Sequence, residues 1–146
     1  MKQLIGLTIL LFAITACGSV QAANAPVLPV VSSGGTVEDL TSLIDALRAE
    51  IKLSGTVEQE FFSVTGQILK IGGVDVQVFE YETTEAMEAE ASLIASDGGT
   101  VGTSMITWVD TPHFYKLGRL IVLYVGSDEA VLSFLEQTLG EQFAGR

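Results

Sequence analysis

Apolar residues recur along the chain at two spacings, one typical of helices and the other of strands. Over residues 37–51, leucine and isoleucine return every three or four positions, a period that predicts an amphipathic helix. Over residues 66–81, apolar and polar residues alternate on either side of Gly72 and Gly73. A two-residue turn needs positive φ, so this pattern predicts a hairpin that turns at the two glycines and buries one face.

A similar order of elements follows in the second half of the chain. A helix is expected over residues 83–96, and a second hairpin over residues 112–126, with its turn at Leu117 and Gly118. The last helix is expected over residues 127–143, where apolar side chains again follow a helical period. The order of hairpin and then helix therefore occurs twice.

Together these patterns predict an α+β fold in which one helix is followed by two ββα units. Residues 120–125 are apolar or aromatic at every position, which predicts a strand in the middle of a sheet. Additional short strands are expected near residues 60–64 and 105–109. We expect a mainly antiparallel sheet with helices packed mostly on one of its faces.

The first 16 residues have the features of an export signal. Lys2 precedes an almost wholly apolar run from Leu4 to Ile14. This run is too short to cross a membrane as a helix, because the hydrocarbon core requires about 20 residues. Residues 1–16 are therefore expected to be removed from the mature protein.

The motif Ile14-Thr15-Ala16-Cys17 at the end of this run resembles the lipobox of bacterial lipoprotein precursors. The resemblance implies that diacylglycerol is attached to Cys17 and that cleavage occurs directly before it. Two acyl chains hold a protein stably at a membrane, whereas a single chain does so only marginally. The alternative is an ordinary signal peptide, cut near Val20-Gln21-Ala22 and leaving no lipid.

Residues 17–35 are expected to form the lipidated cysteine and a tether, because they are poor in charge and rich in Ala, Pro, Ser and Gly. The remaining residues, 36–146, are expected to fold as a single α+β domain. Stretches of this domain such as LIDALRA and FFSVTGQ resemble small, uncharacterised bacterial lipoproteins. That resemblance implies no activity.

The chain is strongly acidic, with 7 Lys and Arg residues against 18 Asp and Glu residues and a formal net charge of -11. Such a surface repels nucleic acids and anionic headgroups, so we expect no nucleic-acid partner. The charge either serves solubility alone or favours a basic partner. Because Cys17 is the only cysteine, its lipidation would leave no disulfide, thiolate nucleophile or cysteine metal site.

The only histidine, His113, is close in sequence to Asp110, and such a pair could perform acid–base chemistry. In the expected hairpin, however, His113 shares a strand face with Tyr115 and Tyr124, which favours a packed histidine over a catalytic one. We nevertheless keep one candidate surface or ligand site, which consists of Trp108, Asp110, His113 and Tyr115. No residue is assigned a catalytic role.

Five carboxylates lie between the first hairpin and the middle of the next helix: Glu80, Glu82, Glu85, Glu88 and Glu90. Calcium needs a loop that returns several oxygens to one point, which neither a strand face nor a helix face does. Residues 96–102 are rich in glycine but lack the lysine of a phosphate-binding loop. We therefore expect neither a metal nor a cofactor.

These features favour a membrane-anchored extracytoplasmic lipoprotein whose domain is a non-enzymatic binding module for a protein or a small molecule. We expect a monomer at the cell membrane or outer membrane, facing outside the cytoplasm. The alternatives are a hydrolase that uses Asp110 and His113, and a structural component of the envelope. An enzyme would need His113 in a concave pocket with Asp110 within hydrogen-bond reach.

Replacing Cys17 tests the anchor. Cys17→Ser is expected to release the protein from membranes or to leave an uncleaved precursor, because serine has no sulfur to carry the lipid thioether. Membrane fractionation and intact-mass measurement check this outcome. A mature wild-type chain that begins at Ala23 and carries no lipid mass would contradict the lipobox and support an ordinary signal peptide.

Overall fold

The computed structural model describes residues 38–46 and 52–145. The expected export signal at 1–16, the lipobox with Cys17 and the tether up to residue 35 lie outside the described residues. The expected domain start at Thr36 and the last five residues of the expected first helix, 47–51, lie outside them as well.

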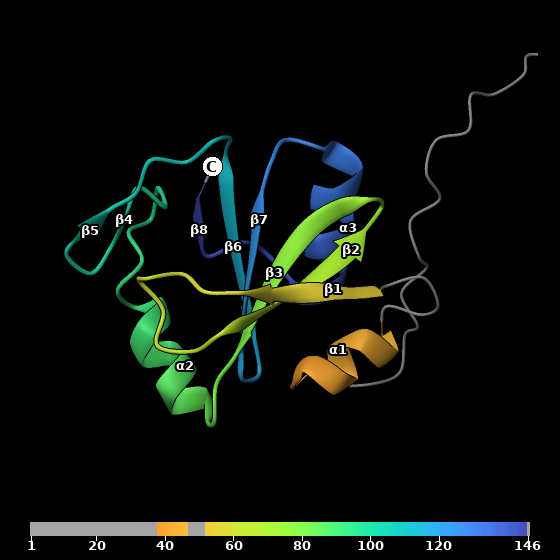
Figure 1. The fold of residues 1–146 in the computed structure, drawn as a ribbon, viewed down its shortest axis with the longest axis horizontal. Helices are drawn as coiled ribbons and strands as arrows, with labels where there is room; N and C mark the ends of the chain where they lie inside the picture. The colour runs from red at the N-terminus through yellow and green to blue at the C-terminus, as the bar shows by residue number, and fades with distance from the viewer. Residues whose placement is uncertain (1–37, 47–51, 146) are drawn as a thin grey trace, which may run out of the picture.

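Six strands, each antiparallel to its neighbours, form the main sheet of the described residues (Figure 1). Their order across the sheet is β1 (Lys52–Val57), β2 (Gly66–Ile71), β3 (Val74–Glu80), β7 (Leu120–Val125), β6 (Pro112–Leu117) and β8 (Ala144–Gly145). A separate small sheet consists of β4 (Thr100–Val101) and β5 (Ser104–Met105). The helices are α1 (Leu40–Ala46), α2 (Thr84–Ala91) and α3 (Glu129–Leu139). The expected α+β class is confirmed.

Strand β7 lies inside the sheet and is buried on both faces, as its unbroken apolar sequence predicts. Its neighbours are β3 and β6, and residues 120–124 are all buried. Successive side chains point to opposite faces of a sheet, so Val122 enters one core and Ile121 the other. Both faces of the sheet therefore need to be covered.

Helices α1 and α3 cover one face of the sheet, and α2 lies apart from them and covers the other (Figure 1). The first core contains Leu43 of α1 and, from α3, Val131, Phe134, Leu135 and Leu139. The second core contains Met87 and Ala91 of α2 together with Phe62, Phe79 and Phe114. The expectation that the helices pack mostly on one face of the sheet is therefore not confirmed, because each face is covered by at least one helix. The reason is that β3 carries Phe79 on the face opposite to Val76, so the second face is also apolar.

The first hairpin has the register that its glycine turn predicts. Ile71 pairs with Val74 across Gly72 and Gly73, whose φ angles are 60° and 87°. Glycine adopts positive φ without the steric cost that other residues incur. Val76 and the other residues expected on the inner face belong to the core that also contains side chains of α1 and α3, which confirms the buried face.

The second hairpin turns one residue later than expected. Leu117 pairs with Leu120, which places Gly118 and Arg119 in the turn. A tertiary contact accompanies this turn: a Cβ on Gly118 would lie 2.4 Å from backbone atoms of Glu38, just before α1. Only glycine fits at this position, and its φ of 59° suits the turn.

This later turn changes the partner of His113 but not its face. His113 is opposite Tyr124 instead of Val122. The register shift amounts to two residues, and a shift of two leaves every side chain on the same face because strands repeat with period two. The expected partner is therefore wrong, while the expected face of His113 and Tyr115 is right.

Helix α1 begins later than the apolar period predicts, and Lys52, directly after the expected helix, is the first residue of β1. Asp39 and Ser42 hold its start in a reciprocal cap. The Asp39 carboxylate accepts from the Ser42 N–H at 2.8 Å, and the Ser42 hydroxyl oxygen accepts from the Asp39 N–H at 3.0 Å. The hydrogen bond from the Ser42 N–H is the main cause that lowers the pKa of Asp39 below its usual range.

Two expected strands and one expected cap also differ. The prediction of a strand near residues 60–64 is wrong, because the chain turns there and the Phe62 N–H donates to the Gln59 carbonyl oxygen. Of the strand expected at 105–109, only Met105 is in strand conformation, as the end of β5. The sequence favours Ser127 as the start of the last helix and either Thr83 or Thr84 as the cap of the helix before it. In the structure, Asp128 caps α3 and Thr83 caps α2.

The two hairpin–helix segments are not structural equivalents. Helix α2 follows β3 on one face, and α3 follows β7 on the other. A rotation that brings β2 and β3 onto β6 and β7 turns about an axis normal to the sheet, so it would keep both helices on the same face. The similar order of elements therefore does not amount to a repeated three-dimensional unit.

Two strand glycines provide a matched test of packing in the second core. A Cβ on Gly66 would lie 2.6 Å from the buried ring of Phe79, whereas a Cβ on Gly55 meets no atom within 4 Å. Gly66→Ala should lower the free energy of unfolding by about 1–3 kcal/mol through overpacking. Gly55→Ala should change it by less than about 0.5 kcal/mol. Urea unfolding measures both, and equal effects would show that Phe79 does not confine Gly66.

Candidate functional site

His113 is a buried residue of β6, with 5% of its surface exposed. Its Nε2 lies 3.1 Å from the carbonyl oxygen of Gly126, and its Nδ1 lies 2.7 Å from Oε1 of Gln142. Its ring stacks on Tyr124, with centroids 6.0 Å apart. Since a backbone carbonyl oxygen only accepts hydrogen bonds, the Nε2–H group is the donor of the hydrogen bond to the Gly126 oxygen. Both ring nitrogens are occupied, and Asp110 is the partner of neither.

Tyr115 is buried on the same face as His113 and is 0% exposed. Its hydroxyl has no hydrogen-bond partner within the described residues. Burial, with a smaller effect from the negative charge of Glu136, raises the pKa of Tyr115 to about 12. The hydroxyl therefore keeps its proton, and Tyr115 serves as a packing residue beneath α3.

Trp108 and Asp110 lie away from this buried pair. Trp108 is half-buried on the α2 face, where it packs against Phe114 and donates from Nε1 to the Gly98 carbonyl at 2.7 Å. Asp110 is exposed, and its carboxylate accepts from the N–H of Thr111. The structure thus divides the four candidate residues, with the histidine and Tyr115 on the α3 face and the tryptophan on the α2 face.

Exposed charge and exposed apolar surface meet at the connection between β1 and β2. This connection is residues 58–65 (EQEFFSVT), here called the acidic loop. Phe62 anchors the loop, because the residue is only 8% exposed and its ring centroid lies 4.5 Å from that of Phe79. Gln59 provides a second attachment by donating from Nε2 to Oε1 of Gln77 in β3 at 2.8 Å.

A third attachment joins the acidic loop to α2. The Glu90 carboxylate accepts from the Ser63 N–H at 3.1 Å and from the Tyr81 hydroxyl at 2.7 Å. Burial and the neighbouring Glu90 carboxylate raise the pKa of Tyr81 well above its usual range, so its hydroxyl remains a donor. Glu90 therefore holds the acidic loop against both the helix and the end of β3.

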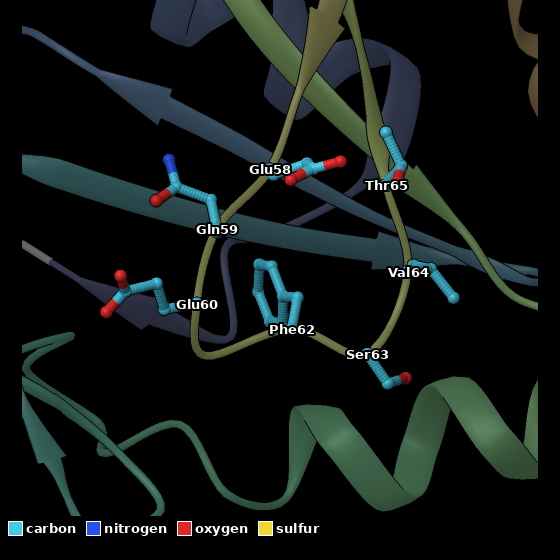
Figure 2. A pocket seen from close by; sticks show the side chains of 7 residues that line it. All are labelled: Glu58, Gln59, Glu60, Phe62, Ser63, Val64 and Thr65. Atoms are coloured by element: carbon cyan, nitrogen blue, oxygen red, sulfur yellow. The ribbon is translucent and has the colours of Figure 1, made fainter.

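Two cavities lie beside the acidic loop and share Glu58, Gln59 and Glu60. The first, of about 290 Å³, lies between the two arms of the loop and is also lined by Phe62 and residues 63–65 (Figure 2). Glu58 extends across it, whereas Glu60 points away on the other side (Figure 2). The second, of about 300 Å³, lies between the loop and residues 104–107. The loop thus offers carboxylates on both of its sides.

The second cavity, here called the cleft, has apolar walls as well as charge. Phe61 lines it from the loop, with Met105 and Ile106 opposite. The Phe61 ring packs edge-on against Trp108 at 5.9 Å between centroids. Met105 is 86% exposed, and Val109, four residues further along the chain, is 99% exposed. Exposed apolar side chains rimmed by polar residues are typical of an interaction surface.

The described part of the chain contains neither a candidate metal site nor a helix that could span a membrane. No group of three or more His, Cys, Asp or Glu side chains in residues 38–46 and 52–145 is placed to hold a metal ion. No helix in these two ranges is long and apolar enough to cross a membrane. The residues that line the cleft supply carboxylates, an amide, hydroxyls and apolar groups.

No family model matches this chain, and neither a curated protein nor a solved structure matches it. Its function is therefore inferred from its own residues.

Periodicity alone misses the acidic loop, because it predicts a strand near residues 60–64. The adjacent Phe61 and Phe62 are the signal that could have found it. In a strand these neighbours point to opposite faces, so one ring becomes exposed unless both faces are covered. Glu58 and Glu60 just before them add charge that is costly to bury.

Glu90 provides a test of how the acidic loop is held. Glu90→Ala removes the acceptor for the Ser63 N–H and the Tyr81 hydroxyl. We expect faster amide exchange at Ser63 and a free energy of unfolding lowered by about 1–3 kcal/mol, as for an unpaired buried donor.

The matched control is Glu88→Ala on the same helix, which removes only the exposed ion pair with Lys116. It should lower the free energy of unfolding by less than about 1 kcal/mol. NMR-detected exchange and urea unfolding measure both variants. Unchanged protection of the Ser63 amide in Glu90→Ala would contradict the assigned role of Glu90.

Proposed function

We propose that the protein is a lipoprotein, anchored through Cys17 outside the cytoplasm, whose domain is a non-enzymatic binding module. Its contact surface is the cleft together with Val109. The observation that carries this proposal is the exposure of Met105, 86%, in the cleft that Phe61 also lines, and of Val109, 99%, which follows the tryptophan packed on Phe61. Covering such surface is favourable by roughly 25 cal/mol per Å² of apolar area.

The surroundings of the histidine support binding over hydrolysis. A hydrolase of the expected kind needs a histidine that is free to accept a proton and is oriented by a carboxylate. His113 is buried, and its two nitrogens contact Gly126 and Gln142. The described residues that line the cleft include no histidine. The cleft therefore suits recognition better than acid–base chemistry.

The N-terminal sequence supports the anchored location. The lipobox at Ile14-Thr15-Ala16-Cys17 and the proposed tether at 17–35 would hold the domain near a membrane surface. The acidic character of the chain, whose full sequence has a net charge of -11, would keep the domain away from anionic headgroups. We propose a monomer at the cell membrane or outer membrane, with the cleft accessible to a partner.

Photocrosslinking in the host envelope tests the contact surface. A photoreactive residue in place of Val109 should give a discrete adduct, because this side chain is exposed and follows Trp108, whose ring packs on Phe61 of the cleft. The same residue in place of Gln137, exposed on α3 across the sheet, should not. Adding Met105→Ser to the Val109 probe should lower the yield, which gel shift and mass spectrometry measure.

Two results would contradict the proposal. One is the same adduct pattern from positions 109 and 137, which would indicate non-specific contact. The other is an adduct yield at position 109 that Met105→Ser leaves unchanged, which would show that the cleft is not the contact surface.

A further inference from the structure

We propose that the cleft binds a cationic, apolar polypeptide segment, in which a lysine or arginine lies next to aliphatic residues. The inference rests on the proposed function, because it names the class of partner for the same surface. Three features support it: the charge of the cleft, the chemistry of its walls and its size.

The carboxylates of the cleft carry charge that no ion pair of the described residues neutralises. Within the described residues, neither Glu58 nor Glu60 forms a salt bridge. Three of the basic side chains there are already paired: Lys70 with Asp75, Lys116 with Glu88, and Arg119 with Glu80. The fourth, Lys52, is the first residue of β1, whereas Glu58 follows the last residue of that strand. We therefore assign a complementary cation to the partner.

The walls of the cleft favour a cation with apolar neighbours. Phe61 lines the cleft, and a cation above an aromatic ring is attracted by its electron-rich face. The same contact already occurs in this domain, where Lys116 Nζ lies 5.3 Å from the centroid of the Phe143 ring. Met105 and Ile106 on the opposite wall offer contacts to an aliphatic side chain.

The size of the cleft indicates a side chain of a larger partner. Its volume of about 300 Å³ is at the lower limit of pockets that enclose a whole small molecule, about 300–1,000 Å³. Exposed Val109 adds apolar surface that does not line the cleft. A polypeptide can place one basic side chain in the cleft and cover Val109 with its neighbours. A nucleic acid or an anionic lipid is disfavoured by the charges of Glu58 and Glu60.

Trp108 provides a direct readout, because it is the only tryptophan in the chain and its ring packs against Phe61. The full-length protein, kept in a non-ionic detergent, is titrated with a capped six-residue peptide of alternating leucine and lysine. We expect a saturable change in fluorescence and weaker binding at higher salt. The same peptide with glutamine in place of lysine should bind at least about fivefold more weakly.

Charge-matched variants locate the binding. The double variant Glu58→Gln/Glu60→Gln should weaken binding of the lysine peptide by about 3- to 10-fold, as for two exposed ion pairs. The control Asp45→Asn/Glu136→Gln removes the same charge from exposed positions on α1 and α3. It should weaken binding by less than about twofold, since charges far apart in solution are screened.

Three results would overturn the inference. They are equal affinity for the lysine and glutamine peptides, equal weakening by the two double variants, and no binding of the lysine peptide. The proposed function fails on a different result, because photocrosslinking at position 109 does not depend on the peptide. A specific crosslink at position 109, together with equal affinity for the lysine and glutamine peptides, would support a binding module and contradict a cationic partner.

Discussion

The burial of β7 on both faces is the constraint on which the rest of the structure depends. A strand with apolar side chains on both sides requires a covering layer above and below the sheet. Helices α1 and α3 supply one layer. Helix α2 supplies only part of the other, and Phe62 of the acidic loop completes it above Phe79. The acidic loop is therefore part of the core as well as part of the surface.

This double role explains how a connection between two strands can present a defined surface. Phe62 points inward, while Gln59 and Ser63 are held by Gln77 and Glu90. The residues between and before these attachments, including Phe61 and the two glutamates, are left to face the cleft. For the proposed binding function, a loop held in this way would already be ordered without a partner, so less binding free energy would be lost to ordering it.

Sequence periodicity predicted the elements whose geometry depends on close chain neighbours. The first hairpin is the clearest case, because Gly72 and Gly73 determine both its turn and its faces. The second hairpin could not be predicted as well, since Gly118 fits either possible turn. In the turn that forms, Gly118 lies against the backbone of Glu38, which is 80 residues earlier in the chain and which no local pattern indicates.

The candidate site was predictable only in part, for the same reason. The face of His113 follows from strand period, but its partners Gln142 and Gly126 lie 29 and 13 residues away. Ser63 and Glu90 are separated by 27 residues, so no local pattern indicates their contact. The cleft likewise joins residues 58–61 to residues 104–107, which only the folded sheet brings together.

The most direct measurement of the central claim is the position at which a bound lysine–leucine peptide contacts the domain. Amide chemical shifts recorded during a titration of ¹⁵N-labelled protein would map that position residue by residue. We expect the largest changes at residues 58–61 and 104–109, with the amides of α3 unchanged. The largest changes on α3, or changes spread evenly over the acidic surface, would contradict a binding function for the cleft.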